Sequence, residues 1–276
     1  MTTPPIYVIN LARRTDRMAA MARNLAEAGL TYTRVEAIDA QAVTADWLDT
    51  QFAPPGRFGP LSPPEQACGL SHFRALEHFV TAAHAGARHA VIFEDDIQLS
   101  AEAGDMLASL DWLPASTRLL KIERERDRVL LGRPRPVEAP HPACVAPLHC
   151  DHTGTAGYIV SREAAQALLS IRPKPTLPYD FLLFNPSVSP LFRRLKPQQL
   201  MPPLVEQMAQ QLMDSDIEPS RTDLNWARNH PRGVAKIRRE VLRVYRQGAR
   251  FAATALGGAR WTTIEPLSPA RPPLPP

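Results

Sequence analysis

Hydrophobic and polar positions in the first forty residues follow the order strand, helix, strand. Residues 5–11 form a run of β-branched and apolar residues, which predicts a buried strand. Apolar residues then recur at helical spacing over 18–28, and Gly29 supplies the stop. Residues 31–38 predict a second strand that ends at Asp39. This order implies a parallel pair of strands with a right-handed crossover, and sheets of this kind bind ligands at the carboxyl ends of their strands.

The following residues continue this alternation. Ser71 is placed to cap a helix that runs to His84, and this helix leads into an apolar strand at 90–93. Five prolines between 133 and 147 exclude a central strand or helix in that stretch. The other predicted elements are a helix at 101–110, a strand at 118–122, a glycine-containing turn and strand at 153–160, and a helix at 161–170. The pattern therefore predicts an α/β fold with a mostly parallel central sheet.

Three consecutive carboxylates, Glu94, Asp95 and Asp96, follow the apolar run at 90–93. Adjacent acids at the edge of a core repel one another and lose hydration, so a cation is needed to offset them. Oxygen ligands suit Mg²⁺ or Mn²⁺, which in proteins commonly hold the phosphates of a substrate. A solvated acidic turn would leave the same pattern, and the three residues by themselves do not separate the two interpretations.

Composition places the chain among ordinary globular proteins. Its 276 residues, with 44% hydrophobic content, suffice for one large α/β domain or two small ones. No early segment joins basic residues to a long apolar stretch, and no run approaches the roughly 20 apolar residues of a membrane span. The three cysteines lack a C-x-x-C spacing, which argues against a disulfide framework or a zinc site. We therefore expect a cytoplasmic protein.

Basic residues concentrate near the C-terminus. The net charge is +4, but residues 232–250 hold seven basic residues against one acidic, so this segment carries +6 and the rest of the chain −2. A local excess of this kind argues against nucleic acid as the main substrate. Apolar residues in the segment follow helical spacing, which predicts a cationic amphipathic helix. Such a helix either lies on an anionic membrane surface, as a peripheral anchor, or packs on the domain.

Six short motifs occur in a fixed order along the chain. They are Tyr-Val-Ile-Asn-Leu-Ala-Arg-Arg-Thr-Asp-Arg at 7–17, Ala-Cys-Gly-Leu-Ser-His at 67–72, Val-Ile-Phe-Glu-Asp-Asp-Ile at 91–97, Gly-Thr-Ala-Gly-Tyr-Ile-Val-Ser at 154–161, Leu-Pro-Tyr-Asp at 177–180, and the late Gln207 with Asp-Ser-Asp-Ile at 214–217. Together they resemble glycosyltransferase family 25, the group that includes bacterial lipooligosaccharide galactosyltransferases and collagen galactosyltransferases. The resemblance covers roughly residues 5–220.

The resemblance implies a GT-A type, Rossmann-like fold, a nucleotide-sugar donor, a divalent metal and inversion at the anomeric carbon. On this basis residues 1–222 are expected to form the transferase domain, 223–260 the basic helical segment, and 261–276 a Pro-rich tail. The expected reaction moves a hexose, galactose from UDP-galactose, onto a lipooligosaccharide or other surface-glycan acceptor. Two rival functions are a non-catalytic relative that binds a glycan or partner, and metal-dependent phosphoryl transfer.

Two features depart from the family pattern. The turn after the second strand usually reads Asp-Gly in the family, whereas this chain has Asp39-Ala40. The proline-dense stretch at 133–147 lies where acceptor-side loops are expected. The identity of the acceptor is therefore left open.

Donor and metal ligands are expected at the ends of the first three strands. By analogy with other GT-A enzymes, Asp96 is the expected ligand of Mn²⁺ or Mg²⁺, together with Asp95. Glu94 and Asp95 are also expected to contact either the ribose or a water next to the metal ligands. The remaining expected donor contacts are Asn10, Arg13 and Arg17 at the end of the first strand and Asp39 at the end of the second. Asp39 would serve equally as an Asx cap, and Arg17 as a solvated helix residue.

Candidates on the acceptor side come from later in the chain. Inverting transfer requires a general base, and Asp180 is the best-placed isolated acid, although it would also suit a helix cap or an acceptor contact. His152 is a candidate third metal ligand or a structural residue, and His72 is either a site residue or a core histidine. Gly154 and Gly157 are expected to let the backbone approach the donor sugar or pack tightly behind it.

Overall fold

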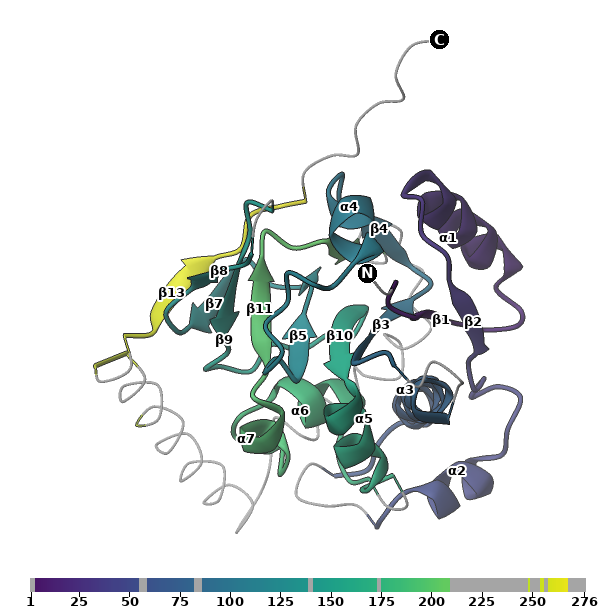
Figure 1. Ribbon diagram of the computed structural model, residues 1–276. Helices are drawn as coiled ribbons and strands as arrows, with labels where there is room; N and C mark the ends of the chain where they lie inside the picture. The colour runs from purple at the N-terminus through teal and green to yellow at the C-terminus, as the bar shows by residue number, and fades with distance from the viewer. Residues whose placement is uncertain are drawn as a thin grey trace.

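The structure is a computed structural model, and it describes residues 3–54, 59–81, 86–138, 141–172, 175–208, 248, 254–255 and 258–267. A single large sheet runs through the molecule, with helices on both sides (Figure 1). The α/β class predicted from the sequence is therefore confirmed.

The main sheet has eight strands in the order β2-β1-β3-β10-β5-β11-β9-β8. The bounds are β1 Ile6–Asn10, β2 Thr33–Glu36, β3 His89–Glu94, β5 Leu119–Lys121, β8 Arg135–Pro136, β9 Cys144–Pro147, β10 Gly157–Ser161 and β11 Gln198–Met201. The pairs β2–β1, β1–β3 and β5–β11 are parallel, and the other four neighbouring pairs are antiparallel. Only β10 and β9 run against the remaining six strands, so the expected mostly parallel sheet is present.

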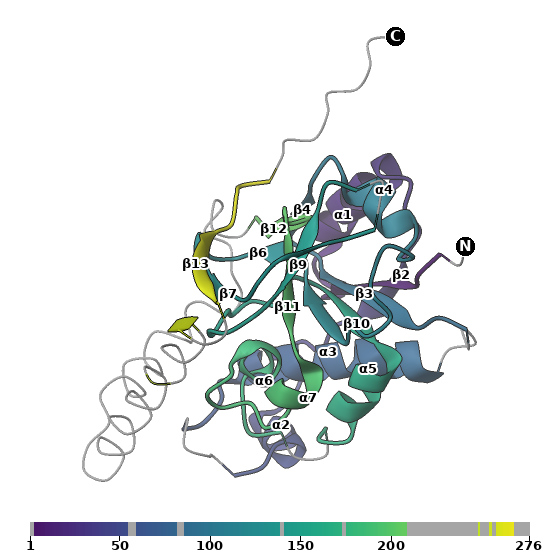
Figure 2. The same ribbon diagram turned by 60° about the vertical axis from the view of Figure 1, so that its left-hand side comes forward.

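Helices form one layer on each face of this sheet (Figures 1 and 2). On one face lie α1 Thr15–Glu27 and α4 Ala103–Ala108. The other face carries α3 Pro63–Thr81, α5 Arg162–Leu169, α6 Tyr179–Phe184 and α7 Phe192–Leu195, and α2 Ala45–Gln51 packs against α3. Successive residues of a strand point to opposite faces. Tyr7 and Ile9 of β1 accordingly join the core beneath α3 and α5, whereas Ile6 and Val8 join the core beneath α1 and α4.

Two smaller sheets complete the described chain. One contains β4 Ile97–Leu99, β12 Val205–Gln207 and β6 Glu123–Arg124, in the order β4-β12-β6. The other pairs β7 Arg128–Leu131 with β13 Arg260–Thr263. The three-stranded sheet begins where β3 and β5 end, and it brings Gln207 next to the acidic triplet.

Two local expectations were wrong. Ser71 does not cap a helix, because α3 already begins at Pro63 and Ser71 lies in its middle, where its hydroxyl donates to the Ala67 carbonyl oxygen at 2.7 Å. The proline-dense stretch does contain a strand of the main sheet, β9, which pairs with β11 over four residues. The pairing is possible because the prolines lie before the strand and at its last position, Pro147.

The C-terminal assignments are tested only in part. The predicted basic helix over 232–250 and the motif at 214–217 lie outside the described residues, apart from residue 248. Residues 260–263 form β13 against β7, so the boundary expected at 261 falls inside a strand. Among the residues that the structure describes, no helix is long and apolar enough to cross a membrane.

Candidate functional site

A cleft opens at the carboxyl ends of β1, β2 and β3. One wall is the N-terminal half of α3, and the opposite side is closed by Arg17 of α1 and by Gln207. The residues around the cleft include six of those predicted from the sequence: Arg13, Arg17, Asp39, Glu94, Asp95 and Asp96. The parallel strands β2, β1 and β3 bring these side chains together, because their carboxyl ends meet at one edge of the sheet.

Asp95 is held from two sides. The amide nitrogen of Asn10 donates to Asp95 Oδ2 at 2.5 Å, and Arg17 NH1 lies 3.5 Å from Asp95 Oδ1. The side-chain oxygen of Asn10, Oδ1, in turn accepts from Arg34 Nε at 2.9 Å. Burial nevertheless raises the pKa of Asp95 above its usual value, against the lowering effects of Asn10 and Arg17. Asn10 thus fixes the carboxylate from behind, and it does not line the cleft itself.

The pKa of Asp96 lies well above its usual value. Burial, together with the charges of Glu94 and Asp95, raises its pKa to about 7. Its partners are Arg17 NH1 at 3.3 Å and the side-chain amide of Gln207, which is 3.2 Å from both carboxylate oxygens. Arg17 therefore pairs with two of the three adjacent carboxylates, Asp95 and Asp96, and the negative charge of the triplet is only partly balanced. A hard divalent cation would restore the balance, and the oxygen donors of Asp96 and Asp95 suit such an ion.

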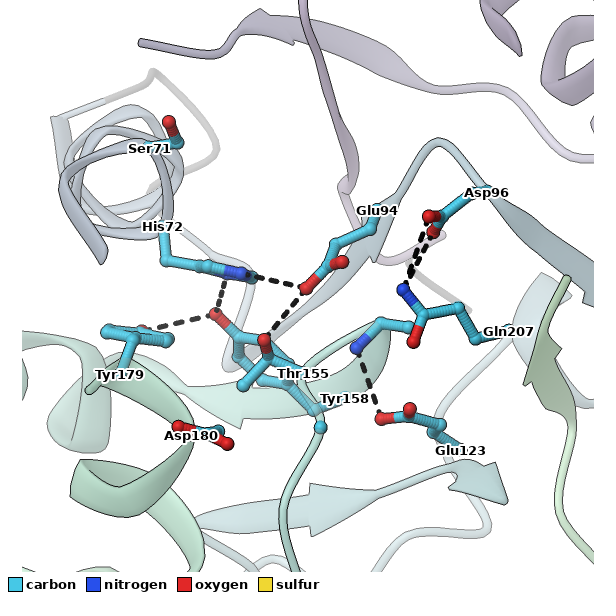
Figure 3. A network of polar contacts seen from close by, with 12 residues as sticks. Ser71, His72, Glu94, Asp96, Glu123, Thr155, Tyr158, Tyr179, Asp180 and Gln207 are labelled. Atoms are coloured by element: carbon cyan, nitrogen blue, oxygen red, sulfur yellow. Dashed lines mark hydrogen bonds and ion pairs between the residues drawn. The ribbon is translucent and has the colours of Figure 1, made fainter. Parts of the chain in front are cut away.

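Glu94 belongs to a hydrogen-bonded chain that runs into the core (Figure 3). Its Oε1 lies 3.2 Å from His72 Nε2 and accepts from Thr155 Oγ1 at 2.8 Å. His72 Nδ1 contacts the Tyr158 hydroxyl at 3.1 Å, and that hydroxyl is 3.2 Å from the hydroxyl of Tyr179. Burial alone would raise the pKa of Glu94, but the His72 and Thr155 contacts hold it below its usual value. Glu94 is thus the acid of the triplet that stays ionised most readily.

His72 is a buried residue of α3 whose two ring nitrogens both contact polar side chains. Its side chain is 1% exposed, and its ring stacks on Tyr179 with centroids 4.5 Å apart and an interplanar angle of 9°. Both predicted alternatives therefore apply, since His72 is a core histidine that also reaches a cleft acid. Its partners Thr155, Tyr158 and Tyr179 were not singled out from the sequence. The sequence feature that could have pointed to them is a hydroxyl side chain next to an apolar run, because a buried hydroxyl needs a hydrogen-bond partner.

Arg13 and Asp39 form an ion pair across the cleft mouth. Arg13 Nε lies 2.7 Å from Asp39 Oδ2, and Asp39 Oδ1 accepts from the backbone nitrogen of Gln41 at 2.9 Å. The second contact is an Asx turn, so the structural alternative for Asp39 is present. The side chain of Arg13 is 36% exposed, which leaves it accessible to an anionic ligand.

Asp180 does not line the cleft. It lies in the first turn of α6, is 8% exposed, and accepts from the backbone nitrogen of Phe181 at 2.8 Å. In Figure 3 it lies below Tyr179, away from Glu94 and Asp96. This geometry matches the alternative role of a helix cap. The role of general base stays a prediction.

His152 is likewise outside the cleft. It is fully buried, and its Nδ1 lies 3.6 Å from Glu125 Oε2. Burial lowers its pKa to about 4, against the raising effect of Glu125. The structure therefore brings His152 to Glu125 and not to Asp96, and the arrangement does not support the expected role as a third ligand beside Asp96.

Gly154 and Gly157 pack behind the site. At Gly154, φ is +85° and a Cβ would lie 2.7 Å from Glu123 Oε1. A Cβ at Gly157 would overlap the side chain of Val205. Glu123 itself pairs with Lys121 at 2.7 Å, and both side chains are 0% exposed. Of the two roles expected for the glycines, tight packing behind the site is the one that the structure supports.

Comparison with known proteins points to a single family. The model of glycosyltransferase family 25 (LPS biosynthesis protein) matches residues 3–183. Procollagen galactosyltransferase 1 of Danio rerio is 29% identical over 64% of this chain and 30% of its own length. The lacto-N-neotetraose biosynthesis glycosyltransferase LgtB of Neisseria gonorrhoeae is 30% identical over 65% of this chain and 66% of its own.

A third relative carries a different description. The probable inactive glycosyltransferase 25 family member 3 of Bos taurus is 30% identical over 64% of this chain and 31% of its own length. The matched part of the chain thus spans about a third of the animal relatives and less than two thirds of LgtB.

Proposed function

The chain belongs to glycosyltransferase family 25, and from that premise we propose that it is a metal-dependent inverting hexosyltransferase. The proposed donor is a UDP-hexose, with UDP-galactose as the first choice because two of the relatives are described as galactosyltransferase or lacto-N-neotetraose glycosyltransferase. The proposed acceptor is a surface glycan, such as the saccharide of a lipooligosaccharide.

The observation that carries this proposal is the burial of Asp96 beside Asp95 at the cleft floor, which together with the neighbouring charges raises the pKa of Asp96 to about 7. A carboxylate that resists ionisation when its site holds no cation is suited to bind one. Asp96 and Asp95 would hold Mn²⁺ or Mg²⁺, which when bound neutralises the diphosphate of the leaving nucleotide. Gln207 and Asn10 keep the two carboxylates in position through hydrogen bonds of 3.2 and 2.5 Å.

Donor binding falls to the residues at the ends of β1 and β2. Arg13 and Arg17 line the cleft and offer guanidinium groups to the phosphate oxygens. Asp39 then accepts a hydrogen bond from the ribose or uracil, as acids at this position do in nucleotide-binding sheets. Since Arg13 pairs with Asp39 at 2.7 Å, donor binding would exchange that ion pair for contacts with the nucleotide.

The acceptor hydroxyl must lose a proton as it attacks the anomeric carbon. Asp180 is the proposed base, as the acid of the Leu-Pro-Tyr-Asp motif. It is 8% exposed and does not line the cleft, so the acceptor would have to approach it from the side of α6. Asp180→Asn should leave donor binding unchanged and lower the rate of transfer, whereas equal losses of both would point to a structural role.

A non-catalytic relative of the same fold is the second candidate. It is favoured by the likeness to a family member described as probably inactive. Both candidates allow nucleotide binding, so only turnover separates them.

Transfer itself is the direct test. Purified protein would be incubated with UDP-galactose, UDP-glucose or UDP-N-acetylglucosamine, with and without Mn²⁺, and with lipooligosaccharide-derived saccharides as acceptors. The proposal expects release of UDP and addition of one hexose with a single donor, only with metal, and at least about a hundredfold less with Asp96→Asn. Turnover that is independent of metal, or equal in the variant, would contradict it. Nucleotide binding without turnover on any acceptor would favour the second candidate.

A further inference from the structure

Three side chains of different chemistry converge on one wall of the cleft. Cys68, His72 and Glu94 each present one donor atom, and these atoms all lie within 4.8 Å of one another. Cys68 and His72 are four residues apart in α3, so they project from the same helix face one turn apart. Glu94 reaches them from the end of β3. The donors are a thiol sulfur, an imidazole nitrogen and a carboxylate oxygen, which is the ligand set that zinc accepts.

The surroundings of His72 favour a metal at its Nε2 atom. When Nδ1 carries the proton and donates to the Tyr158 hydroxyl at 3.1 Å, Nε2 presents a lone pair toward the cleft. Glu94 Oε1 lies 3.2 Å from that atom. In the metal-free site an Nε2 proton donates to this oxygen in the other tautomer, and a cation that binds between the two atoms replaces that proton. Histidines that bind metals are oriented in this manner, by a hydrogen bond from the other ring nitrogen.

The three donor atoms are close to the separation that a tetrahedral site requires. Zinc lies about 2.3 Å from sulfur and about 2.0–2.1 Å from nitrogen, which places its ligand atoms roughly 3.3–3.8 Å apart. The His72 and Glu94 atoms are 3.2 Å apart, just below this range. Cys68 is half-buried at the cleft surface and must move by about an ångström at most, which a rotation about its side-chain bonds supplies.

We propose that Cys68, His72 and Glu94 form a binding site for a zinc-class divalent cation, separate from the oxygen-ligand site at Asp95 and Asp96. Binding converts the Cys68 thiol to a thiolate, and its proton leaves to solvent. A fourth position faces the cleft and takes water or an anion. Sequence spacing did not reveal this site, because Glu94 follows Cys68 by 26 residues and only the fold brings it to α3.

Occupancy of this site has a consequence for the cleft, which rests on the proposed function. Glu94 already points at His72, and the cation would hold it there, so that it could not make the nucleotide contact expected of it. A zinc-class cation should therefore weaken donor binding, whereas Mn²⁺ at Asp96 should strengthen it.

Cobalt is a suitable probe, since Co²⁺ replaces zinc and a thiolate ligand gives it an intense near-ultraviolet absorption that oxygen ligands do not give. Tag-free protein would be titrated with Co²⁺ and then with Zn²⁺ against a chromophoric chelator. We expect one thiolate-bound cobalt per chain, displaced by zinc. Cys68→Ser should abolish the absorption and weaken zinc binding at least about tenfold, and His72→Gln should weaken it similarly.

Matched variants separate this site from its neighbours. Cys144→Ser removes another half-buried thiol, from β9, and should leave the cobalt spectrum unchanged. Asp96→Asn should also retain the absorption, because Asp96 belongs to the other site. Circular dichroism would verify that each variant is folded. No thiolate band in the wild type, or a band that Cys68→Ser and His72→Gln both retain, would overturn the proposal without affecting the transferase assignment.

Discussion

Two buried clusters of charge lie at the ends of β3 and β5, the strands on either side of β10, and they are balanced differently. At the end of β3, Asp95 and Asp96 pair with Arg17, Glu94 contacts His72, and the pKa of Asp96 rises to about 7. At the end of β5, Lys121 and Glu123 pair at 2.7 Å with neither side chain exposed. The first cluster has an excess of negative charge at a cleft, whereas in the second a positive and a negative charge pair with each other.

The Lys121–Glu123 pair acts as a brace, because it also binds backbone groups of the residues before β10. Lys121 also donates to the carbonyl oxygens of Thr153 and Gly154, at 2.8 and 2.6 Å. Glu123 Oε2 accepts from the backbone nitrogen of Ala156 at 3.1 Å. These bonds hold the turn that precedes β10. A cluster whose opposite charges pair with each other thus points to stability, and one with excess charge beside a cleft points to binding.

The largest expected effect on stability comes from breaking the balanced cluster. Lys121→Met removes the cation and leaves Glu123 buried without its charge partner, which should cost about 3–5 kcal/mol of unfolding free energy. Urea denaturation of the metal-free protein would measure it. As a control, adding Glu123→Gln should recover part of the loss, since the double variant buries no charge. A loss below about 1 kcal/mol would mean that the pair is not the brace described here.

The unbalanced cluster should respond in the opposite direction. The folded-state pKa of Asp96 is raised to about 7, so the unfolded chain binds fewer protons, and this group destabilises the metal-free fold progressively as the pH rises from about 4 to about 7. Asp96→Asn should therefore be more stable than wild type at pH 8, by on the order of 3 kcal/mol. The advantage should disappear near pH 4, and added Mn²⁺ should reduce it. Paired urea titrations at both pH values would show whether the difference has this sign.

His152 offers a third comparison, because burial lowers its pKa to about 4. The unfolded chain then binds a proton that the folded chain does not, so stability falls as the pH drops from about 6.5 to about 4. The loss should reach about 3 kcal/mol, and His152→Gln should remove it. Wild type and variant would be compared at pH 7 and pH 4.5. The same pH dependence in both proteins would show that other groups, such as Glu125, are responsible.

The smallest effect is expected from the glycine behind the site. A Cβ at position 157 would overlap Val205, so Gly157→Ala should cost about 1–3 kcal/mol through overpacking. Gly86→Ala is the matched control, because a Cβ there meets nothing within 4 Å. Thermal unfolding of both variants would compare them. If Gly157→Ala behaved like the control, β10 and β12 could not be as closely packed as described.

The sequence predicted those helices and strands that are encoded by a local pattern of apolar residues. The strands at 5–11 and before Glu94 were recognisable as continuous apolar runs, and the helix over 18–28 was recognisable from its helical spacing and the glycine that ends it. The short strands β6, β11 and β12 were missed because they have two to four residues, too few for a period, and form through pairing with distant partners.

The site residues at the ends of strands were also predictable from the sequence. Six of the expected residues line the cleft because they follow strands that the sequence places in parallel. The grouping of His72, Thr155 and Tyr179 around Glu94 was not predictable, since it depends on α3, β10 and α6 meeting in space. His152 was misplaced for the same reason. Its position before a glycine turn does not reveal that the turn points the ring toward Glu125.

The central claim is that Asp96 holds the metal to which a nucleotide sugar binds. The most direct measurement is the thermal midpoint of unfolding with UDP-galactose, with and without Mn²⁺, for wild type and Asp96→Asn. A ligand that binds only the folded state raises this midpoint. The account predicts a rise in wild type that requires both Mn²⁺ and nucleotide sugar and is absent in the variant. No rise in wild type with any UDP-hexose, or the same rise in Asp96→Asn, would contradict it.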